Sequence, residues 1–160
     1  MAKKAKDDKT NVMRIAESAG VVFQDYHYDN SLLNAEEVAA ALGQSVGKVF
    51  KTLVTVAKSG KNYVFMVPAA AELDLKKAAR AAGEKSIEML PQKKLFPLTG
   101  YVHGGCSPIG MKRQFPTFID ASAEAYESIF FSAGKIGRQI EMSLTDLKKI
   151  YPVQSAPLTR

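Results

Sequence analysis

Two β-prone runs joined by a short turn constrain the fold of this 160-residue chain more than any other feature. Residues 49–57 (VFKTLVTVA) and 62–68 (NYVFMVP) are rich in β-branched and aromatic side chains, and the KSGK between them is typical of a turn. The pair therefore predicts a β-hairpin. Because the first run is apolar on both of its alternating faces, we expect its strand to lie inside a sheet that is covered on both sides.

Turn residues and apolar spacing predict the other elements. Helices are expected at 11–19, 35–42, 75–81, 91–95 and 144–150, a helical turn at 121–126, and further strands at 21–28, 85–89, 117–120, 128–132 and 138–142. Pro97 is expected to end the fourth helix. This irregular mixture predicts an α+β fold with a curved, largely antiparallel, barrel-like mixed sheet and helices packed around it.

The length and composition of the chain are typical of one globular domain. Hydrophobic residues make up 46% of it and charged residues 24%, which suits a chain that buries one core. We expect a mobile basic tail at 1–10, a single domain at 11–152 and a C-terminal tail at 153–160. The chain has one cysteine and neither a membrane-spanning apolar run nor a signal-peptide pattern. We therefore expect a cytoplasmic protein without an internal disulfide or a membrane partner.

The net charge of +6 is the first indication of a partner. A basic surface attracts polyanions over a long range, and nucleic acid is the first polyanion to consider. An excess of lysine also keeps many enzymes soluble. Charge alone therefore leaves both interpretations open.

A glycine-rich stretch, residues 101–110 (YVHGGCSPIG), is the first candidate for chemistry. Gly104 and Gly105 lack a Cβ, so their backbone can adopt positive φ and direct consecutive N–H groups at a bound group. Pro108 stiffens the same turn. Such a loop holds an anion or a carbonyl oxygen, although a purely structural turn has the same composition.

Lys51 is the one charged residue in the apolar run at 49–57. It shares a strand face with Val49 and Leu53, where an ammonium group is costly unless it reaches water or meets an anion. Two interpretations follow. Lys51 either extends to solvent at the edge of the strand or lines a pocket for a phosphate or carboxylate.

Familiar nucleotide and metal motifs are absent. Residues 43–48 (GQSVGK) and 105–112 (GCSPIGMK) do not have the spacing of a P-loop. His27 and His103 have no partners at the spacing of zinc ligands. We therefore expect neither a metal nor a cofactor.

A thiol nucleophile is an alternative chemistry. Cys106 would attack, with His103 as its base and Asp120 as the group that orients the base. Spacing in the sequence does not assemble such a triad, and a lone cysteine in a glycine loop is more often a small buried side chain. We expect Cys106 to belong to the site without acting as its nucleophile.

Four motifs occur in an order that resembles a known family. They are VFKTL at 49–53, LDLKKA at 73–78, GYVHGGCSPIG at 100–110 and FSAGKIGRQI at 131–140. On these motifs the chain, from about residue 19 to residue 150, resembles the YbaK/EbsC group of free-standing aminoacyl-tRNA deacylases, relatives of the editing domain of bacterial prolyl-tRNA synthetases. The resemblance implies the fold of that editing domain.

The resemblance also implies a site. The lysine of the FKTL strand, here Lys51, is the residue tied to activity in the family, and the backbone N–H groups of Gly104, Gly105 and Ser107 are candidates for holding the substrate carbonyl oxygen. The implied substrate-binding residues are Tyr26, Thr52, His103, Cys106, Pro108, Ser132, Gly134 and Gln139. Two of them depart from the family pattern, since Cys106 stands at a usually aliphatic position and Gln139 at a usually acidic one.

The implied activity is removal of wrongly attached cysteine from the 3′ end of proline tRNA, by water or by attack of the substrate's own thiol on its carbonyl. Prolyl-tRNA synthetase is the implied partner protein. Two alternatives stay open: an alanyl-tRNA(Pro) deacylase of the same superfamily, and a non-catalytic module that binds tRNA ends or nucleotides. The basic residues that we expect at tRNA phosphates are Lys76, Lys77, Arg80, Lys93, Lys94, Lys112 and Arg113.

Overall fold

The computed structural model describes residues 9–32 and 34–160. Residues 1–8 of the tail expected at 1–10 lie outside these ranges. Lys9 forms an ion pair with Glu17 at 2.8 Å, and Thr10 is buried where it caps the first helix. These two residues therefore belong to the fold. In the described ranges, no helix is both long enough and apolar enough to cross a membrane.

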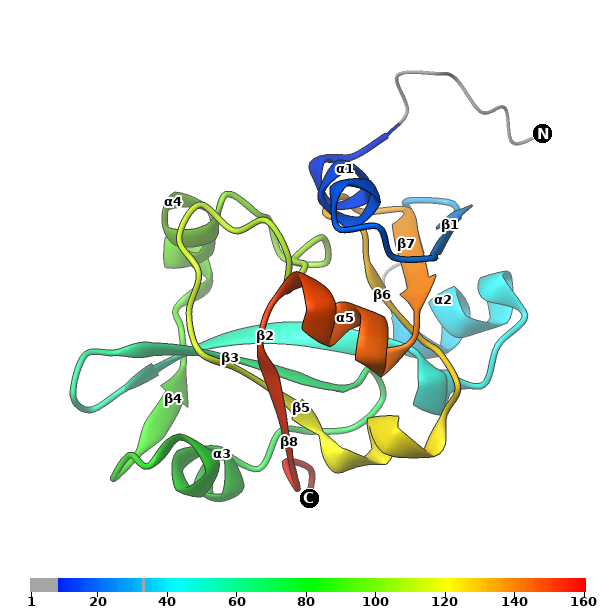
Figure 1. Cartoon of the computed structure of the whole chain (residues 1–160). Coiled ribbons are helices and arrows are strands. Elements are labelled where there is room, and N and C mark those ends of the chain that lie inside the picture. Colours follow the sequence, from blue (N-terminus) through cyan, green and yellow to red (C-terminus); the bar gives the residue numbers. More distant parts are fainter. Residues whose placement is uncertain (1–8, 33) are drawn as a thin grey trace.

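The strands form two sheets that meet inside the molecule (Figure 1). The larger sheet has the order β4-β2-β3-β5-β8, and the smaller one has the order β1-β7-β6. The strands are β1 (Gln24–His27), β2 (Phe50–Ala57), β3 (Asn62–Pro68), β4 (Ile87–Met89), β5 (Thr117–Asp120), β6 (Ile129–Ser132), β7 (Arg138–Met142) and β8 (Val153–Ala156). Antiparallel pairs predominate, and only β3-β5 and β5-β8 are parallel among the described strands. The predicted α+β fold is confirmed, but two open sheets take the place of one barrel-like sheet.

The hairpin of β2 and β3 lies at the centre of the larger sheet. Phe50 pairs with Pro68 at one end and Val56 with Asn62 at the other, which confirms the predicted hairpin. β3 is buried along most of its length, because helices and loops cover both faces of this sheet.

Four of the five α-helices in the described ranges begin where the sequence predicts, but the helix expected at 91–95 is a 3-10 turn followed by an α-helix that begins only at Leu95. The helices are α1 (Asn11–Ser18), α2 (Ala35–Leu42), α3 (Leu75–Ala82), α4 (Leu95–Thr99) and α5 (Leu144–Ile150), with short 3-10 helices at Val46–Lys48, Gln92–Lys94 and Ala121–Ala125. Four of the α-helices have the predicted side-chain caps, Thr10, Asn34, Asp74 and Ser143. The prediction that Pro97 ends a helix is wrong. Pro97 lies in the first turn of α4, where a backbone N–H has no partner within the helix and its loss costs little.

The chain does not trail off after Pro152. Residues 153–156 form β8, which pairs in parallel with β5. The Asp120 carboxylate accepts a hydrogen bond from the Leu158 N–H at 2.9 Å, and Leu158 is fully buried. The C-terminal tail predicted at 153–160 is therefore wrong, because pairing with β5 makes a strand of a segment whose own sequence has little apolar alternation.

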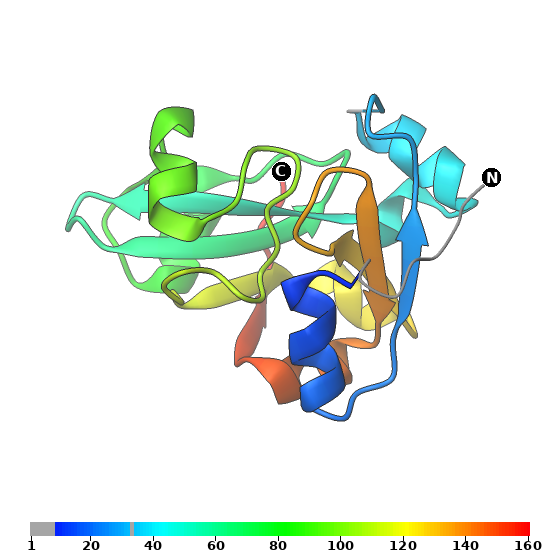
Figure 2. The ribbon, with the colours of Figure 1, turned by 90° about the horizontal axis from the view of Figure 1, so that it is seen from above.

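Helices and loops cover both faces of the larger sheet. On one face α3 packs its Ala78 and Ala79 against Phe65 and Val67 of β3. On the opposite face α4 and the glycine loop pack near Val64, because successive residues of a strand point to opposite sides. The smaller sheet packs against α1 and α5, and Figure 2 shows α1 beside β7. The glycine loop therefore lies over the larger sheet on the side away from α3.

The two sheets are joined just before β2 begins. Val49 forms an isolated parallel bridge with Phe130 of β6, and its carbonyl accepts a hydrogen bond from the Ala69 N–H at 2.7 Å. Val49 and Phe130 are both buried. This junction brings the start of β2 beside the smaller sheet.

Candidate active site

A cavity of about 190 Å³ lies at the junction of the two sheets. Its walls come from β2, the start of α2, the glycine loop, and the ends of β6 and β7. The lining residues are Tyr28, Leu32, Asn34, Ala35, Val38, Val49, Phe50, Lys51, Thr52, Leu53, Ala69, His103, Gly104, Cys106, Ser132, Ile136 and Gln139. Seven of the residues predicted for the site are among them: Lys51, Thr52, His103, Gly104, Cys106, Ser132 and Gln139.

Lys51 is half-buried in the cavity wall. Burial lowers the pKa of its ammonium group below the ordinary value, and the negative charge of Glu72 opposes part of this change. In the described ranges, no carboxylate lies within ion-pair distance of Lys51. A partly desolvated cation without a direct counterion favours an anionic or partly negative group of a ligand.

Two side-chain oxygens of the cavity residues have no hydrogen-bond partner within the described chain. They are Thr52 Oγ1 and Gln139 Oε1, both shielded from solvent. Buried polar atoms in native proteins are nearly always paired, because an unpaired one costs about 1–3 kcal/mol. An amide oxygen can only accept, so the partner that Gln139 lacks is an N–H, O–H or S–H donor. A polar ligand in the cavity would supply such a donor.

The glycine loop is held against the turn between β6 and β7. A Cβ on Gly105 would lie 3.1 Å from the backbone nitrogen of Ile136 and 3.3 Å from the carbonyl carbon of Lys135, so this close contact requires glycine. Gly104 has a φ of +88° and lines the cavity. Gly105 therefore allows the close packing, and Gly104 shapes the cavity wall.

The loop's backbone N–H groups differ in what they can bind. The Gly105 N–H donates to the Val102 carbonyl at 3.0 Å, so it is not free to hold a substrate oxygen. Ser107 and Pro108 are buried and do not line the cavity. Within the described residues, the N–H groups of Gly104 and Cys106 donate to no protein acceptor. These two N–H groups replace those of Gly105 and Ser107 as candidates for holding a carbonyl oxygen.

Ser132 and Gly134 act together in the facing turn. Ser132 lines the cavity, and its Oγ accepts a hydrogen bond from the Gly134 N–H at 3.0 Å. Gly134 has a φ of +101° and lies close to Val12 and Tyr101. Gly134 therefore packs against residues outside the cavity and does not line it, contrary to the prediction.

A comparison with known protein families identifies the domain that carries this cavity. The aminoacyl-tRNA editing domain matches residues 29–150, a range that includes every lining residue except Tyr28. The chain belongs to this family. The predicted resemblance is confirmed, and the protein is an aminoacyl-tRNA editing enzyme, a deacylase that acts in trans.

Two of the relatives of this chain cover nearly all of it, and a third covers about three quarters. EbsC of Enterococcus faecalis, named as a candidate Cys-tRNA(Pro)/Cys-tRNA(Cys) deacylase, is 46% identical over 161 residues, which cover 99% of this chain and 98% of EbsC. The uncharacterised YwhH of Bacillus subtilis is 23% identical over 76% of this chain and 77% of its own. The crystal structure of a candidate trans-editing enzyme for prolyl-tRNA synthetase is 26% identical, has a TM-score of 0.83, and covers 94% of this chain and 98% of its own.

Tyr26 does not line the cavity of this editing domain, contrary to the prediction. Its hydroxyl donates to Glu141 Oε1 at 2.6 Å, and this bond, together with burial and the negative charges of Glu141 and Asp25, raises the pKa of Tyr26 to about 12. Its ring packs against Phe130. Tyr28 lines the cavity instead. Residues 26 and 28 share one side of an extended chain, so alternation alone does not distinguish them.

The structure argues against a cysteine nucleophile in this editing domain. Cys106 is 7% exposed, and burial raises the pKa of its thiol to about 12, so the reactive thiolate is scarce near neutral pH. The Asp120 carboxylate accepts hydrogen bonds from the N–H groups of Ser122 and Leu158. Asp120 is therefore a structural cap and does not orient His103.

One wall of the cavity carries no chemical signal in the sequence. Asn34, Ala35 and Val38 line it from the start of α2, where their pattern predicts only a capped helix. Of the other lining residues that were not predicted, Val49, Phe50 and Leu53 lie in the VFKTL motif and Ile136 lies in the FSAGKIGRQI motif. These two motifs are the signals that could have identified them.

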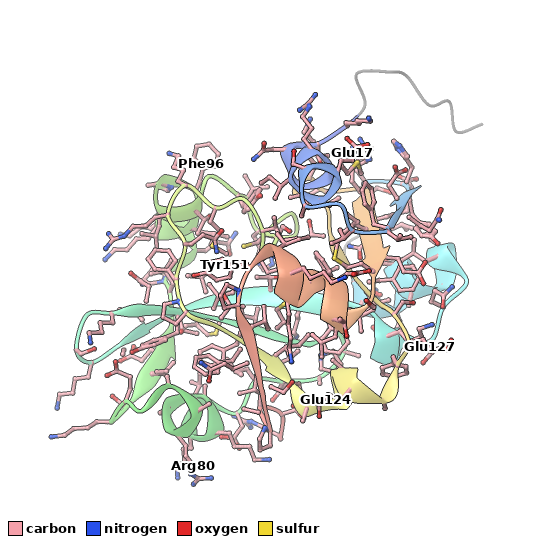
Figure 3. All side chains as sticks on the ribbon, in the orientation of Figure 1. Glu17, Arg80, Phe96, Glu124, Glu127 and Tyr151 are labelled. Carbon is pink, nitrogen blue, oxygen red and sulfur yellow. The ribbon has the colours of Figure 1, made fainter. Side chains whose placement is uncertain are left out.

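The basic residues predicted to contact tRNA lie on opposite sides of the larger sheet. Figure 3 shows this separation at Arg80 and Phe96, which lie on α3 and α4 at opposite sides of the β2–β3 hairpin. One group is Lys76, Lys77 and Arg80 on α3, and the other is Lys93, Lys94 and Lys112 at α4, while Arg113 lies beside the turn between β2 and β3. The two groups do not form one surface, because the larger sheet separates them.

The raised pKa of Cys106 predicts its reactivity. At about pH 8 a thiol with a pKa of about 12 is ionised to roughly one part in ten thousand. Native protein should therefore react with iodoacetamide at least 100-fold more slowly than protein unfolded in urea, as followed by mass spectrometry. Rapid alkylation of the native protein with loss of deacylase activity would restore the cysteine nucleophile.

Proposed function

We propose that this protein removes cysteine from mischarged proline tRNA, acting on the ester at the 3′ end of the tRNA. The observation that supports the proposal most is the cavity at the sheet junction. It joins one partly desolvated ammonium group, that of Lys51, to two buried oxygens without partners, those of Thr52 and Gln139. These groups suit a small, polar aminoacyl group.

The size of the cavity supports the same substrate class. Pockets that enclose a drug-sized ligand usually measure about 300–1,000 Å³, and this one measures about 190 Å³. An amino acid fits a space of this size, whereas a whole nucleotide together with its aminoacyl group does not. The aminoacyl group therefore enters the cavity while most of the tRNA end stays on the surface.

The proposed chemistry needs no strong nucleophile from the protein. An aminoacyl ester is already activated, so donors placed around its carbonyl accelerate cleavage by stabilising the charge that develops on the oxygen. The N–H groups of Gly104 and Cys106 are the candidate donors. Lys51 favours negative charge in the same cavity, either on the substrate or on the terminal phosphate.

Cysteine supplies its own nucleophile in this proposal. Its thiol gives up a proton and its sulfur attacks the ester carbon, forming a C–S bond as the bond from that carbon to the ribose oxygen breaks. The ribose oxygen takes up a proton, and the cyclic thioester that is released is hydrolysed by water. The positive charge of Lys51 favours this step because it stabilises the thiolate. Attack by water on the ester is the alternative.

Selectivity among three esters tests this proposal. Cysteine and serine differ by one atom, and binding in a small pocket discriminates such pairs by only about 10- to 200-fold. Attack by the substrate thiol should therefore release cysteine from proline tRNA more than 200-fold faster than serine, as measured by loss of labelled amino acid. Alanine, which has no nucleophile, should also stay attached.

Other outcomes of that measurement point to other functions. Faster release of alanine would assign the cavity to alanyl-tRNA(Pro), since the space is small enough for either amino acid. Equal release of cysteine and serine would favour attack by water. Binding of tRNA without release of any amino acid would contradict the enzymatic proposal and leave a non-catalytic module.

Gln139 should contribute to substrate binding and not to folding. Because its Oε1 is buried without a partner, replacing it in Gln139→Met should leave the free energy of unfolding unchanged within about 0.5 kcal/mol or raise it. The same variant should raise KM for cysteinyl-tRNA about tenfold, the effect of one lost hydrogen bond. Gln24→Met, at an exposed position of β1, is the matched control and should change neither quantity. A large loss of stability with unchanged KM would give Gln139 a purely structural role.

A further inference from the structure

Phe96 is a large apolar side chain that the fold leaves exposed. It lies on α4 and is 55% exposed, and Figure 3 shows it on the outer side of that helix. Val102, in the segment that connects α4 to the cavity residue His103, is 48% exposed. A solvent-facing aromatic ring beside an active site needs an explanation, because its burial against a partner would be favourable.

One cation lies over this ring, and two more lie beside α4. The Lys112 ammonium lies 5.5 Å from the centre of the Phe96 ring. The Lys112 N–H donates to the Thr99 carbonyl at 2.9 Å, and its side chain crosses Gly100, where a Cβ would lie 3.3 Å from Lys112 Cγ. The fold thus holds Lys112 over the end of α4. Lys93 and Lys94 line a shallow hollow on the same helix, together with Pro97 and Leu98.

The sequence around the ring has only positive charge. Residues 89–119 contain Lys93, Lys94, Lys112 and Arg113 but no aspartate or glutamate. This stretch includes both α4 and the glycine loop that lines the cavity. A phosphate chain that approaches the cavity along this stretch meets cations of the same segment and no carboxylate from it.

We propose that α4 and Lys112 form the binding surface for the unpaired 3′ end of the tRNA, with one base stacked on Phe96 and the lysines at the neighbouring phosphates. Aromatic side chains next to cations bind single-stranded nucleic acid in this way, because every base has a flat face and every nucleotide a phosphate. This inference rests on the proposed function for its ligand. It adds a surface outside the cavity and a role for a residue, Phe96, that no motif identifies.

The distance from Phe96 to the cavity suits such a path. Phe96 lies one helical turn before Gly100, which is about 6 Å along the axis of α4. The three residues from Gly100 to His103, at the cavity, span at most about 11 Å when fully extended. Consecutive stacked nucleotides are about 3.4 Å apart, so a few unpaired nucleotides cover the interval between the ring and the aminoacyl group.

The composition of the surface favours nucleic acid over a protein partner. Lysine is depleted in the centre of protein–protein interfaces, whereas here the Lys112 ammonium lies over the ring, and Lys93 and Lys94 lie just before α4 in the chain. An ammonium in a dry interface would lose its hydration, but at a phosphate it gains a counterion. A synthetase surface that docks on Phe96 is therefore the less favourable occupant, and the test distinguishes it.

A tryptophan placed at this position reports stacking directly, because the chain contains no tryptophan of its own. The full-length variant Phe96→Trp is titrated with an RNA hairpin that carries no amino acid. The hairpin has the acceptor-stem sequence and ends in unpaired CCA. Stacking of a base should quench the tryptophan fluorescence in a saturable manner. A hairpin without the unpaired end should quench it little. The matched control is Val22→Trp, at a position that is 77% exposed outside α4.

Binding by the other variants completes the test. Phe96→Ala should weaken binding of the CCA hairpin about tenfold, and Phe96→Leu, which keeps apolar bulk without a flat ring, should weaken it similarly. Equal binding by the wild type and Phe96→Ala, or the same quenching in Val22→Trp, would overturn the proposal. So would weaker binding of prolyl-tRNA synthetase, with RNA binding unchanged, in Phe96→Ala.

The ligand in these experiments carries no amino acid, so the result does not depend on cleavage. If the hairpin binds through Phe96 but no ester is cleaved, the proposed function fails and the binding surface stands. If cysteine is released and Phe96→Ala releases it with unchanged KM, the function stands and the binding surface fails.

Discussion

The contact between Val49 and Phe130 is the interaction on which the cavity depends. It joins two sheets that otherwise have separate hydrogen-bond networks, and both residues are buried. Because Val49 directly precedes β2, the contact fixes the position of Lys51 and Thr52 relative to Ser132 and Gln139 of the smaller sheet. The two sheets also share one hydrophobic core, in which Phe50 packs with Phe131 and Ile140, so the bridge sets the relative position of side chains on sheets that already pack together.

The packing of the glycine loop is a second constraint on the shape of the cavity. The glycine loop approaches the turn between β6 and β7 so closely that a Cβ on Gly105 would lie 3.1 Å from the backbone of Ile136 and push it aside, and Gly104 and Cys106 have N–H groups without a protein acceptor within the described residues. The cavity also contains two buried oxygens that the described chain does not pair, Thr52 Oγ1 and Gln139 Oε1. Such groups reduce stability, and their concentration at one cavity is what a binding site for a polar ligand requires.

Local sequence patterns predict much of this fold, and long-range contacts explain the rest. The hairpin and the caps Asn34 and Asp74 follow from turn chemistry and short-range spacing, and these predictions are confirmed. β8 is missed because its pairing with β5 comes from a segment more than thirty residues away. For the site, motifs single out Lys51 and Gly104, but exclusion of Tyr26 requires its hydrogen bond to Glu141. The separation of the basic residues likewise depends on which face of the sheet each helix covers, and no local pattern determines that.

The central claim is that Lys51 acts on an aminoacyl ester in this cavity, and deacylation of cysteinyl-tRNA(Pro) by Lys51→Ala tests it most directly. Loss of a group that stabilises developing charge lowers kcat by about 100- to 1,000-fold. We expect a loss of this size with tRNA binding unchanged within about threefold, and no loss in Lys58→Ala, an exposed lysine in the turn that directly follows the same strand. Cysteine release by Lys51→Ala at the rate of the wild type would contradict the account.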